Sequence, residues 1–376
     1  MAGIYLHIPF CKKRCIYCDF FSTTRSEQKT AYIRALCREL TDREAYLEGE
    51  HIETIYLGGG TPSQLAKEDF EAIFSHIYKV YKVIPDAEIT LEANPDDLTS
   101  EYISMLRTFP FNRISMGIQT FQDSTLKLLQ RRHTAEQAIR AFQNCRTAGF
   151  RNISIDLMYG LPGETLASWK EDLKQALALH PEHISAYHLI YEEGTTLWQL
   201  REQHKLEEAD EDLSVSLFGT LIDSLTAAGY EHYEISNFCL PGFHSRHNSS
   251  YWTEKKYLGC GPSAHSYNGT SRQWNVASLN EYIRGISNGN PTFEVEELDL
   301  YTRYNDFVIT HIRTQWGMPL PKLRKQYGEE LYKYCLRMAT PHLQQGTLEI
   351  KNDTLKLTRK GIFISDGIMS DMLWVE

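Results

Sequence analysis

Short runs of strand-forming residues alternate with longer amphipathic stretches through the first half of the chain. The strand-like runs cover residues 4–8, 54–59, 88–94, 113–119, 153–160 and 184–190. Between them lie stretches such as residues 26–48 and 168–179, where apolar residues recur every three or four positions, as on one face of a helix. Six repeats of strand and helix predict an α/β fold whose parallel strands form a partial (β/α)6 barrel.

Polar residues and glycines gather where these strands end. They are Gly58 to Thr61, Glu92 with Asn94, Gln119, Asp156, and Tyr187 with His188. In a barrel of parallel strands, active sites are built on the face where the carboxyl ends of the strands meet. Strand ends attract turn and cap residues in any fold, but the repetition along the chain favours a functional site on this face.

The alternation stops near residue 232, so we expect a change of architecture there. Residues 1–231 are interpreted as the barrel and residues 232–297 as a connecting region with a short strand and a glycine-rich loop. Residues 298–376 indicate a small, mainly helical and winged-helix-like domain. We expect this last domain to pack against the barrel and to carry no chemistry of its own.

Composition and charge exclude several classes of protein. The 376 residues are 42% hydrophobic and 23% charged, as in an ordinary globular chain, and the formal net charge of -10 argues against nucleic acid as a partner. The N-terminus lacks a signal pattern, and no apolar run approaches the roughly 20 residues of a transmembrane segment. Five of the eight cysteines are scattered, as buried thiols in a reducing compartment are. We therefore expect a cytoplasmic protein.

The other three cysteines lie close together in the segment YLHIPFCKKRCIYCDFFS, which follows the first strand. Thiolates at the spacing of Cys11, Cys15 and Cys18 suit zinc or an iron-sulfur cluster. A closed zinc site needs a fourth ligand, and the nearest candidate, His7, lies on the strand itself. A [4Fe-4S] cluster held by three cysteines instead leaves one iron open to a small molecule with an amine and a carboxylate.

The spacing C-x3-C-x2-C after a first strand, with Tyr17 just before the last cysteine, resembles the radical S-adenosylmethionine (SAM) enzymes. This resemblance implies a partial TIM-like radical SAM barrel in which Cys11, Cys15 and Cys18 hold a [4Fe-4S] cluster. It also implies that SAM binds the open iron, where an electron from the cluster cleaves it to a 5'-deoxyadenosyl radical.

Further motifs narrow the resemblance. The segments LGGGTPS, EITLEANP, RISMGIQTF, LQRRH and IDLMYGLPGET are similar, in order and spacing, to those of the oxygen-independent coproporphyrinogen oxidases and the HemW haem chaperones. The resemblance runs over essentially the whole chain, so residues 298–376 are expected to match the C-terminal domain of that subgroup. By this resemblance, the SAM-binding residues are Tyr5, Gly59, Gly60, Thr61, Glu92, Gln119, Arg131 and Asp156.

Two departures from the oxidases point to the HemW group within this subgroup. The oxidases carry a fourth cysteine two residues after the third, where this chain has Phe20, and they carry a longer segment before the first cysteine. The resemblance therefore implies a haem chaperone that delivers haem to haem-requiring proteins, including membrane respiratory enzymes, and that needs an electron donor for its cluster. The alternative is an oxygen-independent coproporphyrinogen III oxidase, so whether the chain is an enzyme stays open.

The segment HNSSYW matches a motif of the HemW group that is associated with haem. An imidazole can ligate haem iron, and aromatic rings can lie against a porphyrin. The resemblance thus offers His247, Asn248, Tyr251 and Trp252 as haem-binding residues, with His265 and Cys260 as further ligand candidates. The alternative is that these side chains plug one end of the barrel.

Overall fold

The computed structural model describes residues 1–375 and contains six parallel strands in consecutive order. These strands are β1 (Ala2–Ile8), β2 (Ile52–Gly59), β3 (Val83–Ala93), β4 (Arg113–Gln119), β5 (Ile153–Tyr159) and β6 (His183–His188). Each strand pairs in parallel with the next. The predicted (β/α)6 arrangement is therefore confirmed.

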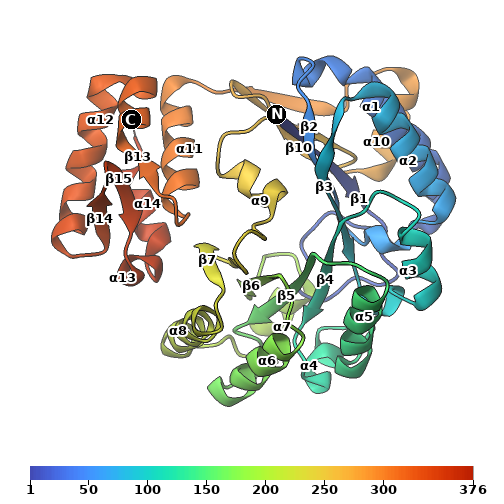
Figure 1. Cartoon of the computed structure of the whole chain (residues 1–376), viewed down its shortest axis with the longest axis horizontal. Helices are drawn as coiled ribbons and strands as arrows, with labels where there is room; N and C mark the ends of the chain where they lie inside the picture. Colours follow the sequence, from blue (N-terminus) through green and yellow to red (C-terminus); the bar gives the residue numbers. More distant parts are fainter. Residues whose placement is uncertain (376) are drawn as a thin grey trace.

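Helices cover the outer side of these strands (Figure 1). They are α1 (Lys29–Asp42), α2 (Lys67–Val80), α3 (Ser100–Leu106), α4 (Asp123–Leu128), α5 (Ala135–Thr147) and α6 (Leu166–Ala178). The period of two along β1 explains the arrangement, because Ile4, Leu6 and Ile8 are fully buried in the main core while Tyr5 and His7 point inward. The inner face of the curved sheet thus carries the polar side chains.

The sheet extends beyond the six strands at both edges, which the sequence pattern did not predict. After α7 (Thr196–Glu202) and α8 (Glu211–Ala227), the hairpin of β7 (Glu231–Glu234) and β8 (Asn237–Cys239) pairs antiparallel with β6. At the other edge β9 (Tyr257–Cys260) pairs parallel with β1. It is followed outward by β10 (His265–Tyr267), β11 (Ser271–Asn275) and β12 (Phe293–Glu297), with α10 (Leu279–Asn288) before β12. Residues 232–297 therefore build strands of the same twelve-stranded sheet.

The short helix α9 (Arg246–Tyr251) lies on the concave side of the strands (Figure 1). Its first backbone N–H groups, those of Arg246 and His247, each donate a hydrogen bond of 3.0 Å to the carboxylate of Glu88 on β3. Glu88 is buried and carries the negative charge that a helix N-terminus favours. This contact fixes α9 inside the barrel near the amino ends of the strands.

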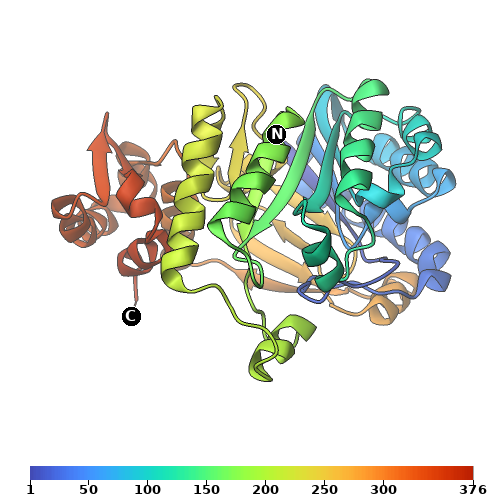
Figure 2. The same ribbon diagram turned by 90° about the horizontal axis from the view of Figure 1, so that it is seen from below.

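The C-terminal elements form a separate core beside α8 (Figure 2). They are α11 (Leu300–Ile312), α12 (Leu320–Gln344), α13 (Arg359–Ile362) and α14 (Ser365–Met372), with a small sheet of β13 (Met318–Pro319), β14 (Leu348–Lys351) and β15 (Thr354–Leu357). Phe363 packs on Phe218 of α8 with 5.3 Å between ring centroids. The expected helical domain with a β-wing is confirmed, and none of the helices within residues 1–375 is long and apolar enough to cross a membrane.

Candidate functional site

A cavity of about 470 Å³, called the cysteine cavity below, lies at the carboxyl ends of the barrel strands. Its size falls within the range of about 300–1,000 Å³ that is usual for small-molecule sites. Cys11, Cys15 and Cys18 line it. So do all the predicted SAM-binding residues except Tyr5, namely Gly59, Gly60, Thr61, Glu92, Gln119, Arg131 and Asp156. These residues come from the four strands β2 to β5 and from three loops, and they meet at one space.

The three thiols of the loop are free and half-buried. The backbone N–H of Cys11 donates to the carbonyl of Thr23 at 2.9 Å, and the hydroxyl of Thr61 donates to the Cys11 sulfur at 3.2 Å. Burial raises the pKa of Cys11, and it raises the pKa of Cys18 to about 11. Bare thiolates are thus disfavoured in this loop, and a bound metal is what would deprotonate the thiols.

The backbone passes close to the His7 ring of β1 at Gly59. This residue has a φ of 102°, in the region that favours glycine, and a Cβ there would lie 2.6 Å from the His7 ring. Its N–H donates to the Glu92 carboxylate at 3.1 Å, and the Tyr56 hydroxyl donates to the same group at 2.7 Å. The glycine thus leaves room for the His7 ring, while its amide orients Glu92.

Two half-buried carboxyl groups, those of Glu92 and Asp156, face the cavity and have raised pKa values. Burial, and to a smaller extent the charge of Asp156, raises the pKa of Glu92 to about 7. Burial likewise raises the pKa of Asp156 to about 6, against the opposing charge of Arg113 and the hydroxyls of Ser185 and Ser115. A cationic ligand between these carboxyls would favour their charged forms, so the cavity suits a group with an ammonium or sulfonium centre.

Arg131 connects the cavity floor to the cysteine loop. Its Nη2 donates to the Asn94 side chain at 2.7 Å and to the carbonyl of Gly117 at 2.5 Å, and its Nη1 lies 3.5 Å from the Cys15 sulfur. Its Nε is buried and has no hydrogen-bond partner among residues 1–375. An unpaired guanidinium donor beside a thiol fits an anionic group, such as a carboxylate, bound in this cavity.

The donor set therefore fits a [4Fe-4S] cluster with SAM better than a closed zinc site. The candidate fourth zinc ligand, His7, has both ring nitrogens engaged, with the carbonyl of Phe21 at 2.8 Å and the Tyr5 hydroxyl at 3.2 Å. The three thiols stand at the wall of a cavity that also presents acidic and basic partners for a small zwitterion.

Tyr5 lines a second cavity of about 360 Å³, which we call the aromatic cavity. It is lined by Tyr5, His7, Asp19, Phe20, Phe21, Tyr251, Tyr257, Ser263 and His265. Asp19 and Phe20 also line the cysteine cavity, so the two spaces adjoin at the segment just after Cys18. Phe20, at the position of the oxidases' fourth cysteine, is 63% exposed.

The residues of HNSSYW do not gather around one space. His247 is 1% exposed; one ring nitrogen bonds the Thr54 hydroxyl at 2.8 Å and the other bonds the Tyr251 hydroxyl at 2.9 Å. Burial and the charge of Arg113 lower the pKa of His247 to about 3, so its ring is neutral. This histidine has no nitrogen free for iron, and the geometry matches the alternative that the motif plugs the barrel.

The other members of the motif point to different neighbours. Asn248 lines the cysteine cavity, and Tyr251 lines the aromatic cavity. The Trp252 ring lies under the guanidinium of Arg313 from the C-terminal elements, 4.2 Å from the ring centroid. Of the two further ligand candidates, Cys260 is 0% exposed, whereas His265 is exposed.

Sequence reasoning missed several polar residues of the cysteine cavity, among them Tyr56, Ser115 and Ser185. Tyr56 holds Glu92, and the Ser115 hydroxyl lies 3.3 Å from the Asp156 carboxylate. The signal was available, because each lies two or four residues before a strand-end residue and so faces the same side of the sheet.

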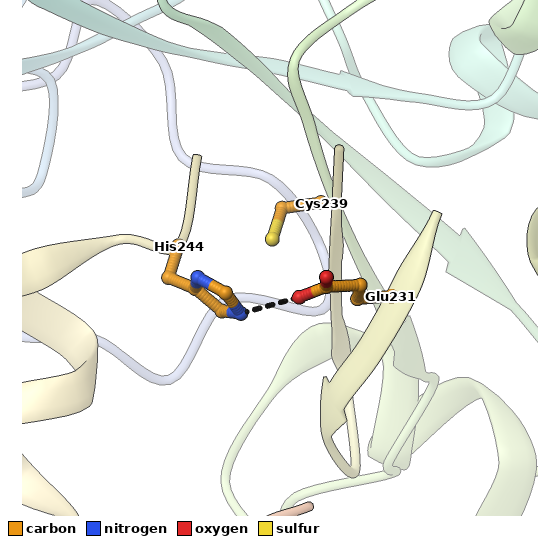
Figure 3. Close-up of side chains that lie close together, drawn as sticks. All are labelled: Glu231, Cys239 and His244. Carbon is orange, nitrogen blue, oxygen red and sulfur yellow. Dashed lines mark ion pairs between the residues drawn. The ribbon is translucent and has the colours of Figure 1, made fainter. Parts of the chain in front are cut away.

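A further group of ligand-type side chains lies at the β7 edge of the sheet (Figure 3). The ligand atoms of Glu231, Cys239 and His244 lie within 4.8 Å of one another, and His244 pairs with Glu231 at 2.9 Å. Neither cavity is lined by these residues. The imidazole of His244 thus lies outside both cavities.

Fold, cysteine loop and cavity define the class of this chain, which is that of the radical SAM proteins. A model of the radical SAM superfamily matches residues 5–176, and a model of the HemN C-terminal domain matches residues 298–364. The superfamily match supports a [4Fe-4S] cluster and SAM as the groups for the cysteine cavity. The solved structure of the coproporphyrinogen III oxidase HemN of Escherichia coli shares the fold, with a TM-score of 0.86. Its sequence is 24% identical, and the match covers 99% of this chain and 89% of that one.

The chain belongs to the HemW family of haem chaperones. It is 32% identical to the heme chaperone HemW of Bacillus subtilis, over 99% of each chain. It is also 36% identical to the heme chaperone HemW of Escherichia coli K12, over 70% of this chain and 69% of that one.

Proposed function

We propose that this protein is a radical SAM haem chaperone, which binds haem and delivers it to haem-requiring proteins. The observation that carries the proposal is the likeness along the full chain to proteins named heme chaperones, 32% identical over 99% of each sequence. Phe20 agrees with it, because the exposed ring stands where the oxidases that this chain resembles have a fourth cysteine.

In this proposal Cys11, Cys15 and Cys18 hold a [4Fe-4S] cluster with one iron open to SAM. The cluster, when bound, supplies electron transfer to SAM. SAM is held by Gly59, Gly60, Thr61, Glu92, Gln119, Arg131 and Asp156. Tyr5, the remaining predicted SAM contact, lines the adjoining aromatic cavity and hydrogen bonds to His7.

The chain's own residues bind and orient this ligand. Arg131 offers its unpaired Nε to the carboxylate end, and the ionised forms of Glu92 and Asp156 accept from ammonium and ribose groups. Removing a buried charged partner costs roughly 2–5 kcal/mol, or about 30-fold or more in affinity. Equilibrium dialysis should therefore show much weaker SAM binding in Asp156→Ala and in Arg131→Ala, with the cluster absorbance retained. Unchanged affinity in both would place SAM elsewhere.

The cargo is haem, and the partners are acceptor proteins that include membrane respiratory enzymes, together with an electron donor for the cluster. A cytoplasmic location fits these partners and the unpaired cysteines. The net charge of -10 leaves nucleic acid out of the scheme.

The test compares cargo binding with turnover in the same preparation. Anaerobically reconstituted protein is titrated with haem and, separately, incubated with SAM and coproporphyrinogen. We expect a saturable Soret band with about one haem per chain and no CO2 above a cluster-free control. Release of CO2 with SAM consumption, and no saturable haem spectrum, would instead identify an oxygen-independent coproporphyrinogen oxidase.

A further inference from the structure

The aromatic cavity has the composition of a site for a flat apolar ligand with a metal. Rings of Phe20, Phe21 and Tyr257 line it, and Ser263 and His265 add polar groups at its wall. Ligand sites are typically apolar concave surfaces with a few placed polar groups, and aromatic faces pack well on other ring systems. The SAM-binding role proposed above uses none of these five side chains.

His265 is the histidine in this cavity whose ring is free to bind iron. It is the first residue of β10 and is exposed, and within residues 1–375 its ring makes no hydrogen bond. Its ring lies 6.3 Å from that of Trp274 on the adjacent β11. Partial burial and the charge of Arg272 lower the pKa of His265, so the neutral imidazole that ligates metals is the prevailing form near neutral pH.

The other ligand candidates lack this freedom. Both ring nitrogens of His7 and both of His247 are hydrogen bonded inside the protein. Cys260 is fully buried, and burial raises the pKa of its thiol well above the usual range. A ligand in the aromatic cavity therefore meets one available imidazole among these four residues.

We propose that the aromatic cavity is the haem site, with His265 as an axial ligand of the iron and Phe20 against one face of the porphyrin. The inference rests on the haem-binding function proposed above and names where that cargo binds. Because Phe20 lines the cavity and is 63% exposed, a porphyrin against its ring keeps one edge in contact with water, which suits a cargo that must be released.

The position of Phe20 also links this site to the cysteine loop. Asp19 and Phe20 line both cavities and follow Cys18 directly in the chain. Haem and cluster would thus lie on either side of Asp19 and Phe20. The Phe20 ring would pack on the porphyrin, which a cysteine side chain at this position could not do.

The test uses full-length, anaerobically reconstituted protein titrated with haem and with iron-free protoporphyrin. The variants are His265→Ala and Phe20→Ala, with His244→Ala as the matched control because His244 is an imidazole outside both cavities. For His265→Ala we expect a displaced Soret band and haem binding weakened at least about tenfold, with protoporphyrin binding unchanged. For Phe20→Ala we expect weaker binding of both porphyrins, by about five- to tenfold, since the lost contact is with the ring.

The outcomes separate the two proposals. If the wild-type protein showed no saturable haem binding, the proposed chaperone function itself would be refuted. Saturable haem binding with an unaltered spectrum in His265→Ala, or the same spectral change in His244→Ala, would overturn the site while the function stands. Cluster absorbance and circular dichroism equal to wild type verify that each variant is folded.

Discussion

His247 is predicted to stabilise the barrel and to leave haem ligation untouched. The side chain is 1% exposed and bridges β2 to the end of α9 through its bonds to Thr54 and Tyr251. Its ring also stacks on Tyr56 with 5.0 Å between centroids. The substitution His247→Ala removes both the hydrogen bonds and the ring packing, whereas His247→Phe removes the hydrogen bonds and keeps the packing.

The expected loss follows from those contacts. His247→Ala leaves the Thr54 hydroxyl, which is 0% exposed, and the Tyr251 hydroxyl without their partners, at about 1–3 kcal/mol for each buried group. Loss of the ring packing adds about 1 kcal/mol. We therefore expect the free energy of unfolding to fall by about 4 kcal/mol, a large share of the total of about 5–15 kcal/mol that is usual for folded proteins. His247→Phe keeps the packing and should lose about 3 kcal/mol.

Urea unfolding followed by tryptophan fluorescence measures this change, and haem titration of the same variants measures the ligand role. His265→Ala, which removes an exposed side chain, should change the unfolding free energy by less than about 0.5 kcal/mol and so controls for truncation of a histidine. If His247→Ala cost less than about 1 kcal/mol while its haem spectrum changed, the assignment of this histidine to the barrel plug would be refuted.

Three further outcomes are expected. Cys15→Ala should abolish the cluster, measured as a fall from about four irons per chain, whereas Cys145→Ala should leave the iron content unchanged. Because burial raises the pKa values of Glu92 and Asp156 to about 7 and about 6, these carboxyls ionise as the pH rises, so SAM affinity should increase from pH 5.5 to 8. Glu92→Gln should remove most of this increase above pH 6, and a retained slope would assign it to another group. Glu39 is buried beside Arg43 and accepts hydrogen bonds from Gly261, Asn275 and Tyr282. Glu39→Ala should therefore lower the free energy of unfolding, measured by urea melts, by about 3–5 kcal/mol. A loss below about 1 kcal/mol would contradict this stabilising role.

Local patterns were sufficient to predict the six strands, their helices and the strand-end polar residues that meet at the cysteine cavity. Residues such as Glu92 and Asp156 end parallel strands, and parallel strands present their carboxyl ends on one face, so the chain order alone brings these groups together. The cysteine spacing is likewise a property of a few consecutive residues.

Pairing between distant segments could not be predicted in this way. β9 joins β1 with Tyr257 opposite Gly3, and nothing in either segment specifies a partner so far along the chain. The same limit applies to α9, whose place inside the barrel depends on the buried carboxylate of Glu88. Reading HNSSYW as a haem motif therefore grouped His247 and Trp252, which face different neighbours in the fold.

Delivery of haem to an acceptor protein is the direct test of the chaperone function. Haem-loaded protein is added to membranes that contain a haem-depleted respiratory enzyme, and recovery of its activity is compared with recovery from the same concentration of free haem. A haem chaperone should give faster recovery from the loaded protein, and slower recovery when the cluster is removed by Cys15→Ala. Recovery at the same rate as with free haem, for both proteins, would contradict it.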